Sequence, residues 1–152
     1  DGLAAGISSI SILALVILFF NLNNIEYILF LCSLMGSLIG FLRFNFHPSK
    51  LIMGDGGSYF LGFIIACFGL ISTKGDASNL YIPILLISIP FFDMIYVIFK
   101  RISKKQSPFF PDNNHIHHRL LKVGYKERKV VYCLYSFNIL TSIICLSIFF
   151  LK

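Results

Sequence analysis

The chain has 152 residues, of which 57% are hydrophobic and only 13% are charged, and its mean hydropathy is +0.81. A typical soluble domain is about 25% charged, so this composition excludes an ordinary soluble domain and indicates a protein that lies in a membrane. The net charge of +6 is not spread evenly along the chain, and its distribution argues against a nucleic-acid partner.

Five apolar segments are long enough, or nearly long enough, to cross a membrane as helices, which takes about 20 residues. In chain order they are Leu3–Phe20, Tyr27–Leu42, Ser58–Thr73, Leu80–Phe99 and Val131–Leu151. Pro83 and Pro90 fall inside the fourth segment, where neighbouring helices can satisfy the backbone groups that a proline frees. We therefore expect an all-α, polytopic transmembrane bundle that forms one domain over residues 1–152.

The basic residues orient this bundle. Segments 43–57 and 100–130 carry eleven of the thirteen Lys and Arg residues, and Lys74 and Lys152 are the other two. Because basic loops stay on the cytoplasmic side, both long loops and Asp1 are predicted to be cytoplasmic, and Lys152 is predicted to lie outside. The first residue is not Met and no signal peptide is visible, so we expect a C-terminal part of a longer chain.

The first polar loop runs from Asn45 to Ser58 and is dense in Gly, Asn and Asp. Gly56 and Gly57 permit close approach of the backbone, and Ser58 is expected to cap the third span. The free N–H groups of that helix start suit a phosphate, and Asp55 beside them offers a hard oxygen for Mg²⁺. An ordinary capping turn is the alternative interpretation.

Asp93 lies inside the fourth span, about 10 Å from its basic end at 1.5 Å per residue. Ionisable groups within a membrane are costly and are candidates for a functional role. The alternative is that Asp93 is a structural partner of a nearby Lys or Arg.

A histidine cluster follows in the last long loop, where His115, His117 and His118 precede Arg119. These side chains can supply hydrogen bonds and positive charge to a pyrophosphate. A zinc site is less favoured, because no further Cys or His set stands at the usual spacing, and a solvated basic loop is the simplest alternative. The four cysteines are expected to be packing residues; they are Cys32, Cys67, Cys133 and Cys145.

Three blocks of the chain resemble the polyprenyl-phosphate N-acetylhexosamine-1-phosphate transferases, integral membrane enzymes that begin cell-envelope glycan synthesis. The first is Asp1–Gly6, which is similar to the second half of the family's Asp-Gly-Leu stretch. The second is Phe41–Ser58, which resembles its magnesium loop, and the third is His115–Leu120, which resembles its histidine motif. The His-x-His-His form is similar to the branch that transfers N-acetylglucosamine 1-phosphate or a related sugar phosphate.

The resemblance implies a role for each matching residue. Asp55 would be the catalytic Mg²⁺ ligand, with Mn²⁺ as an alternative ion, and Asp1 would lie at the uridine pocket. The remaining nucleotide-sugar contacts would come from Asn45, His115, His117 and His118. The implied partners are a UDP-N-acetylhexosamine, a polyprenyl phosphate lipid and the bacterial inner membrane, and a homodimer is a further expectation. The implied reaction releases UMP and leaves a polyprenyl-diphosphate sugar.

Two positions depart from the family's pattern. Ile52 stands where the family usually has an aromatic residue thought to stack on uracil, and Asn113 stands where an Arg is common. The family's paired-Asp motif would lie upstream of Asp1, so we expect these 152 residues alone to be inactive.

Other functions fit parts of the pattern. A transporter or channel segment would use Asp55 and Asp93 on an ion path, but the polar residues collect on one side of the predicted membrane. A non-catalytic scaffold would tolerate any residue at Asp55. A CDP-alcohol transferase would gather several aspartates on one helix pair, which this chain does not do.

Overall fold

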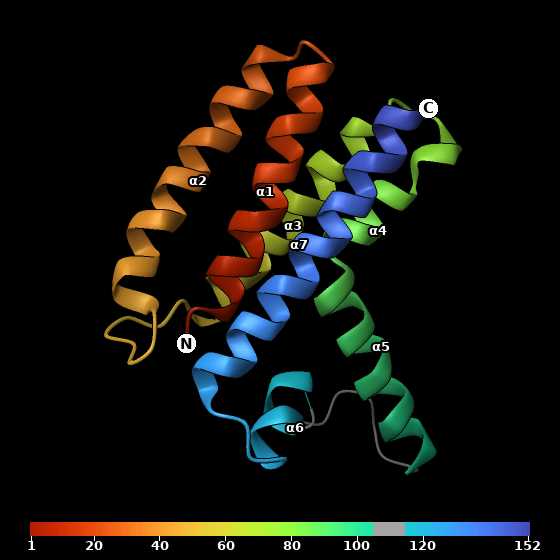
Figure 1. The fold of residues 1–152 in the computed structure, drawn as a ribbon. Helices are drawn as coiled ribbons and strands as arrows, with labels where there is room; N and C mark the ends of the chain where they lie inside the picture. Colours follow the sequence, from red (N-terminus) through yellow and green to blue (C-terminus); the bar gives the residue numbers. More distant parts are fainter. Residues whose placement is uncertain (105–114) are drawn as a thin grey trace.

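The computed structural model describes residues 1–104 and 115–152, without the side chains of His117 and His118. These described residues form seven α-helices and one short 3-10 helix, and they contain no strand (Figure 1). In order they are α1 (Leu3–Asn21), α2 (Ile25–Asn45), α3 (Gly54–Ser72), η1 (Ala77–Asn79), α4 (Tyr81–Leu86), α5 (Ser88–Ser103), α6 (Ile116–Lys122) and α7 (Glu127–Leu151).

The expected transmembrane bundle is confirmed. Helices α1, α2, α3 and α7 are each long and apolar enough to span a membrane. The fourth predicted span is broken: η1 with α4 and then α5 pass the same test as a pair, but they are bent by 83°. The described part of the chain therefore contains four continuous candidate spans and a fifth that is bent.

The bend between α4 and α5 follows from a proline and a serine. The carbonyl of Leu86 would normally accept a hydrogen bond from the residue four positions later, but that residue is Pro90, which has no N–H. Ser11 on α1 supplies the missing donor, with its Oγ 2.8 Å from the Leu86 oxygen. Buried Asn138 of α7 donates to the same Ser11 hydroxyl at 3.1 Å. Three helices thus share one polar junction, which satisfies the backbone at the bend.

Helix α1 is the centre of the bundle, since α2, α3 and α7 all pack against it (Figure 1). Ile12, Leu15, Leu18 and Phe19 on α1 are fully buried, whereas α2, α3 and α7 expose many large apolar side chains outward. Outward-facing apolar surface of this extent suits a lipid environment. Burial inside the bundle and apolarity outside it are both expected of a membrane-spanning protein.

Several helices begin or end further into the polar segments than hydropathy predicts. Helix α2 continues to Asn45, α3 begins at Gly54 rather than Ser58, and α7 begins at Glu127. The connection between α2 and α3 is therefore residues 46–53, shorter than the predicted loop 43–57. Hydropathy detects the lipid-facing part of a helix, whereas the helix itself extends into water as a polar turn.

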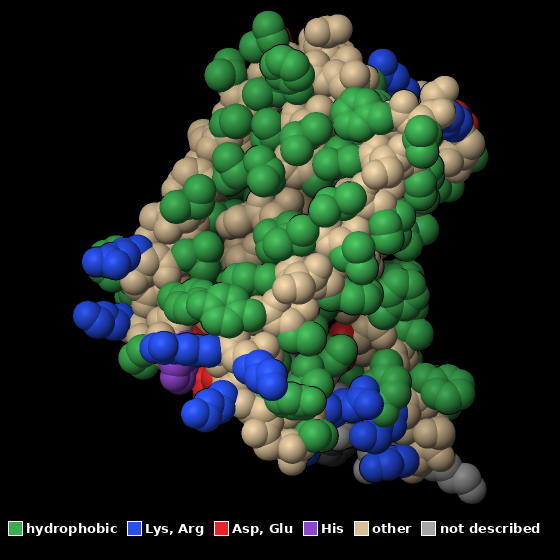
Figure 2. All heavy atoms as spheres, viewed as in Figure 1, with side chains coloured by type: hydrophobic (Ala, Val, Ile, Leu, Met, Phe, Trp, Pro, Cys, Tyr) green, Lys and Arg blue, Asp and Glu red, His purple; other side chains and the backbone are tan. Residues whose placement is uncertain are grey.

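The two ends of the bundle differ in charge. One end holds the N-terminus, the 46–53 connection, α6 and the first turn of α7, and Lys and Arg side chains gather there (Figures 1 and 2). The other end holds the α1–α2 turn, η1 and the C-terminus. There Lys152 pairs with the exposed Asp76, whose pKa is lowered by hydrogen bonds from Ser78 and by Lys152. The first end carries every motif that the sequence singled out.

Candidate active site

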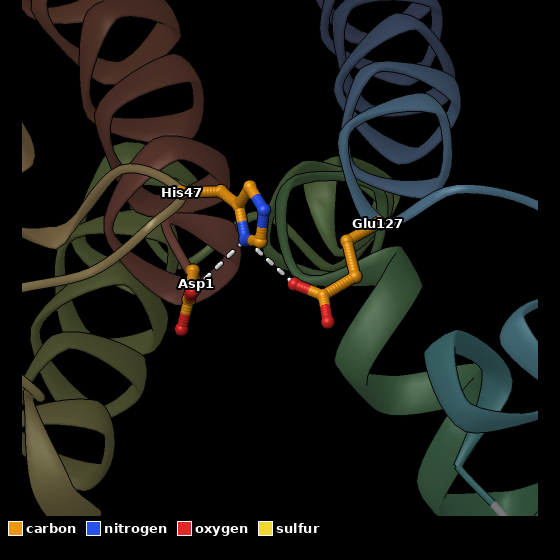
Figure 3. A group of neighbouring side chains, drawn as sticks. All are labelled: Asp1, His47 and Glu127. Carbon is orange, nitrogen blue, oxygen red and sulfur yellow. Dashed lines mark hydrogen bonds and ion pairs between the residues drawn. The ribbon is translucent and has the colours of Figure 1, made fainter.

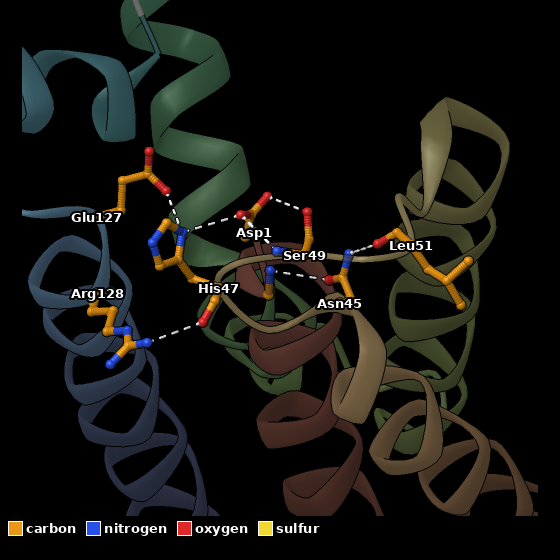
Figure 4. A network of polar contacts seen from close by, with 8 residues as sticks. Asp1, Asn45, His47, Ser49, Leu51, Glu127 and Arg128 are labelled. Atoms are coloured by element: carbon orange, nitrogen blue, oxygen red, sulfur yellow. Dashed lines mark hydrogen bonds and ion pairs between the residues drawn. The ribbon is translucent and has the colours of Figure 1, made fainter.

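The 46–53 connection is tied to the start of α1 by a network of hydrogen bonds (Figure 4). The Asp1 carboxylate accepts hydrogen bonds from Ser49, at 2.8 Å from its hydroxyl and 3.2 Å from its backbone N–H. The Asn45 side chain accepts from the Gly2 N–H at 3.0 Å and donates to the Leu51 carbonyl at 2.6 Å. Two of the predicted site residues therefore order the segment that leads into α3.

Asn45 has a different environment from the one expected of a ligand contact. Its side chain is only 7% exposed, and both ends of its carboxamide bind backbone groups of this chain. A buried carboxamide held in this way fixes the loop conformation rather than presenting itself to solvent. The structure thus gives Asn45 a positioning role at the base of the 46–53 connection.

A second set of contacts joins this connection to α7 (Figure 3). Nδ1 of His47 lies 3.2 Å from an Asp1 carboxylate oxygen and 2.7 Å from a Glu127 carboxylate oxygen. Arg128 also reaches the His47 carbonyl, at 3.4 Å. The sequence alone indicates no role for His47 or Glu127, because residues so far apart in the chain carry no shared local signal.

The start of α3 is open. Asp55 lies exposed in the first turn, and Met53 at the N-cap makes no side-chain capping bond to the described residues. The predicted Ser58 cap is wrong: its hydroxyl donates back to the Gly54 and Asp55 carbonyls at 3.2 and 3.0 Å. Ile52, at the position of the family's aromatic residue, is 86% exposed.

This helix start fits a Mg²⁺–phosphate pair. Gly54 has a φ of 69° and, like Gly56, has open space where a side chain would stand. The helix dipole and the N–H groups of the first turn favour an anion, and Asp55 beside them is a hard oxygen ligand. Since Mg²⁺ usually takes one or two carboxylates and shares substrate phosphates, a single exposed Asp55 is sufficient from the protein side.

Asp93 connects helix α5 to the histidine motif. One carboxylate oxygen lies 2.9 Å from Nδ1 of His115, and the other accepts from the Ile116 N–H at 2.8 Å. The Asp93 side chain is 12% exposed, compared with 44% for His115. Asp93 therefore contacts a histidine and a helix N-terminus, rather than the Lys or Arg that the structural alternative expects. This contact fixes the orientation of the His115 ring, with Nδ1 toward the Asp93 carboxylate.

A second contact, between Arg119 and Tyr96, holds helix α6 against α5. The Arg119 guanidinium lies 4.2 Å from the centre of the Tyr96 ring, within the range of a cation–π contact. The predicted roles of the His117 and His118 side chains lie outside what the structure describes, as does Asn113. Of the histidine motif, the described geometry therefore covers His115 and the backbone of α6.

A cavity joins the three motif blocks. It has a volume of about 220 Å³ and is lined mainly by apolar side chains from α1, α3, α4, α5 and α6. Leu3 of the first block, Ser58 at the end of the second and Ile116 of the third all line it, together with Asp93. Segments that are far apart in the sequence thus meet around one apolar space beside the basic end of the bundle.

The ion-path alternative has little support in this geometry. Asp93 is engaged with His115 and Ile116, while Asp55 is exposed at the same end of the bundle. A conduit requires polar groups through the membrane, and the middle of the described bundle holds instead the junction of Ser11 and Asn138 with backbone carbonyls. The polar side chains of this site therefore collect at one end.

Comparison with known proteins gives a consistent result. Residues 1–73 match the model of glycosyl transferase family 4. The chain is 36% identical over 145 residues to a probable undecaprenyl-phosphate N-acetylglucosaminyl 1-phosphate transferase of Bacillus subtilis, covering 94% of this chain and 40% of that protein. It is 33% identical over 135 residues to an undecaprenyl-phosphate alpha-N-acetylglucosaminyl 1-phosphate transferase of Yersinia pestis, covering 85% and 37%.

Another of the similar proteins is named for a different transferase activity. The chain is 36% identical over 143 residues to a phospho-N-acetylmuramoyl-pentapeptide-transferase of Caldanaerobacter subterraneus, covering 87% of this chain and 40% of that protein. In each case the chain spans about 40% of the length of the curated relative it matches.

Proposed function

The chain belongs to the family of polyprenyl-phosphate N-acetylhexosamine-1-phosphate transferases, and we therefore propose that it carries the donor-binding end of such an enzyme. The intact protein would move N-acetylhexosamine 1-phosphate from a UDP-sugar to a polyprenyl phosphate. An oxygen of the lipid phosphate attacks the β-phosphorus of the UDP-sugar, the bond from that phosphorus to the UMP oxygen breaks, and UMP leaves.

The observation that best supports this proposal is the meeting of the three motif blocks around one cavity. Phosphoryl transfer needs positioning and charge neutralisation more than covalent chemistry from the protein. Open N–H groups at the start of α3 and the basic residues around α6 are suited to a diphosphate. The apolar lining of the cavity is suited to the lipid acceptor.

Asp55 would hold the Mg²⁺ ion that the family uses, with Mn²⁺ as an alternative. When bound, this ion supplies Lewis-acid stabilisation to the diphosphate and to the leaving UMP. The first turn of α3 would bind the phosphate oxygens beside it, because its backbone N–H groups and helix dipole favour an anion.

Asp93 and His115 would act on the donor from α5 and from the start of α6. Asp93 keeps the His115 ring and the start of α6 in place. His115, His117 and His118 would then stabilise the negative charge on the diphosphate as the bond breaks. Asp1 and Asn45 would shape the nucleotide pocket by ordering the 46–53 connection.

The basic end of the bundle would face the cytoplasm, where nucleotide sugars are available. The membrane would be the bacterial inner membrane. The soluble donor would then enter from water, while the tail of the lipid acceptor stays between the helices and the bilayer.

The test is the transfer of radiolabelled N-acetylglucosamine 1-phosphate from UDP-N-acetylglucosamine to polyprenyl phosphate by the intact protein in detergent. We expect Asp55→Asn to lower the rate by about 100-fold or more, because a neutral amide holds Mg²⁺ poorly. The matched control is Asp76→Asn, which removes an exposed carboxylate at the other end of the bundle and should leave transfer unchanged.

A wild-type rate in Asp55→Asn would overturn the assigned role of this carboxylate. Label transfer that is absent from the wild-type protein, together with ion flux through vesicles containing it, would instead favour the transporter. His118→Ala should mainly raise the Michaelis constant for the UDP-sugar, and an unchanged constant and rate would remove His118 from the site.

A further inference from the structure

The carboxylates of Asp1 and Glu127 converge with the imidazole of His47 where three segments of the chain meet (Figures 3 and 4). One ligand atom from each residue can be chosen so that all three lie within 4.8 Å of one another. The residues come from the start of α1, the 46–53 connection and the first turn of α7. We propose that they form a binding site for a divalent transition-metal ion, Zn²⁺ or Mn²⁺, with a different donor set from that of Asp55.

Two carboxylates share one ring nitrogen of His47 in this group. The same nitrogen, Nδ1 of His47, faces both carboxylates, at 3.2 Å from Asp1 and 2.7 Å from Glu127. A ring nitrogen carries at most one proton, so the two carboxylates must compete for it or share it in a weaker bifurcated hydrogen bond. A divalent cation accepts a lone pair from all three groups and offsets both negative charges.

The spacing of these atoms also fits a metal ion. Zinc binds nitrogen and oxygen ligands at about 2.0–2.2 Å, so neighbouring ligand atoms in a tetrahedral site lie about 3.4 Å apart. The two nitrogen–oxygen separations here, 2.7 and 3.2 Å, are close to that spacing. Only small movements of side chains that are 32–52% exposed would complete the site.

Groups around the cluster hold the Asp1 side chain and the backbone of His47 in place. Asp1 accepts hydrogen bonds from the Ser49 hydroxyl and backbone N–H, and the His47 carbonyl is 3.4 Å from the Arg128 guanidinium. Outer partners of this kind orient ligands in natural metal sites, and their loss typically weakens metal binding about 10- to 100-fold.

The donor set determines the class of metal. Imidazole suits Zn²⁺ and its transition-metal neighbours, carboxylates suit Mn²⁺ as well, and Mg²⁺ is usually bound by oxygen alone. A mixed set of one nitrogen and two carboxylates should therefore prefer Zn²⁺ or Mn²⁺ over Mg²⁺. An ion in this place would link the start of α1 to α7 through the connection that leads into α3.

The test measures metal uptake and does not depend on transferase activity. The intact protein is purified in detergent, stripped with a chelator, and titrated with Zn²⁺ in excess Mg²⁺, which occupies any oxygen-only site such as Asp55. We expect about one Zn²⁺ per chain in the wild-type protein and in Asp55→Asn, and at least about tenfold weaker binding in His47→Ala and Glu127→Gln. Glu26→Gln, an exposed carboxylate at the other end, is the matched control.

Two further measurements distinguish the loss of a metal ligand from a folding defect in the variant. Ser49→Ala removes a hydrogen bond to Asp1 but no ligand, so its binding should be weakened less than that of His47→Ala. With bound Mn²⁺, the electron spin echo should show coupling to a ¹⁴N nucleus in Asp55→Asn and lose it in His47→Ala.

Equal Zn²⁺ binding in the wild-type protein and His47→Ala would overturn the proposal. The proposal would also be overturned if His115→Ala lost Zn²⁺ binding while His47→Ala and Glu127→Gln kept it, because the histidine motif would then be the binding group. A transferase that is inactive in Asp55→Asn yet binds Zn²⁺ normally would support both proposals, so each can fail separately. The proposal also gives Asp1 a direct metal contact in place of the uridine contact that the family resemblance implies.

Discussion

The starts of α1 and α3 lie at the same end of the bundle, but they are built in opposite ways. At the start of α1, Gly2 donates to Asn45 and accepts from the Tyr135 hydroxyl at 2.5 Å, and Asp1 is bound to Ser49. At the start of α3, Asp55 is exposed and there is open space beside Gly54 and Gly56. This contrast fits the proposal that the first start supports the site and that the second binds the phosphates of the donor.

The largest effect is expected when a methyl group is added near the start of α1, in Gly6→Ala. The same substitution near the start of α3, Gly56→Ala, is the matched comparison. In Gly6→Ala the new Cβ would stand 1.8 Å from the Tyr135 hydroxyl oxygen and 2.1 Å from its ring, so the Tyr135 side chain or helix α7 must shift and the hydrogen bond to the Gly2 carbonyl is disturbed. We expect the free energy of unfolding in detergent to fall by about 3 kcal/mol, as for severe overpacking. Gly56→Ala, which meets nothing within 4 Å, should change it by less than about 0.5 kcal/mol. Equal stabilities of the two variants would contradict the contrast between the two helix starts.

A smaller loss of stability is expected from Asn45→Asp. The carboxylate keeps an acceptor for the Gly2 N–H, but it places a second oxygen against the Leu51 carbonyl, where the amide now donates at 2.6 Å. Leaving such a buried group unpaired costs about 2 kcal/mol. Thermal unfolding should show this loss, and proteolysis should become faster within residues 46–53. If the connection keeps its protection, Asn45 does not hold it.

The mildest change is expected for Asp93→Asn, which alters charge without altering shape. The amide oxygen still accepts from Ile116, but the group facing Nδ1 of His115 no longer carries a negative charge. We expect kcat/KM for the UDP-sugar to fall about tenfold, which corresponds to about 1.4 kcal/mol, with the unfolding temperature little changed.

Ser103→Ala, an exposed position on the same helix, is the control for Asp93→Asn. An unchanged kcat/KM in Asp93→Asn would mean that Asp93 only caps α6 and does not act through His115.

The spans could be predicted from the sequence because long apolar runs are typical of membrane-spanning helices and uncommon elsewhere. The start of α3 could not, since Gly54–Gly57 lacks the apolar residues by which hydropathy marks a helix, and the predicted cap at Ser58 was wrong. The sequence predicts that neighbouring helices satisfy the backbone group freed by Pro90, as Ser11 on α1 does, but it does not predict the 83° bend.

In the candidate site, too, some residues could be predicted from the sequence and others could not. Asp55 and the histidine motif carry local patterns that a sequence displays, and Asp93 could be singled out because a charge inside a membrane is costly. Its pairing with His115 needed the fold of α5 and α6. The contact between His47 and Glu127 joins two segments with no common motif, so only the three-dimensional arrangement could find it.

The polar junction at the bend between α4 and α5 limits which amino-acid substitutions the chain can accept there. Pro90 removes a donor from the Leu86 carbonyl, and Ser11 restores one from α1. A replacement of Ser11 alone strands that carbonyl, and a replacement of Pro90 alone lets the helix straighten away from the serine. We therefore expect the effects of substitutions at Ser11 and Pro90 to be non-additive, with the double replacement less harmful than the two single effects combined.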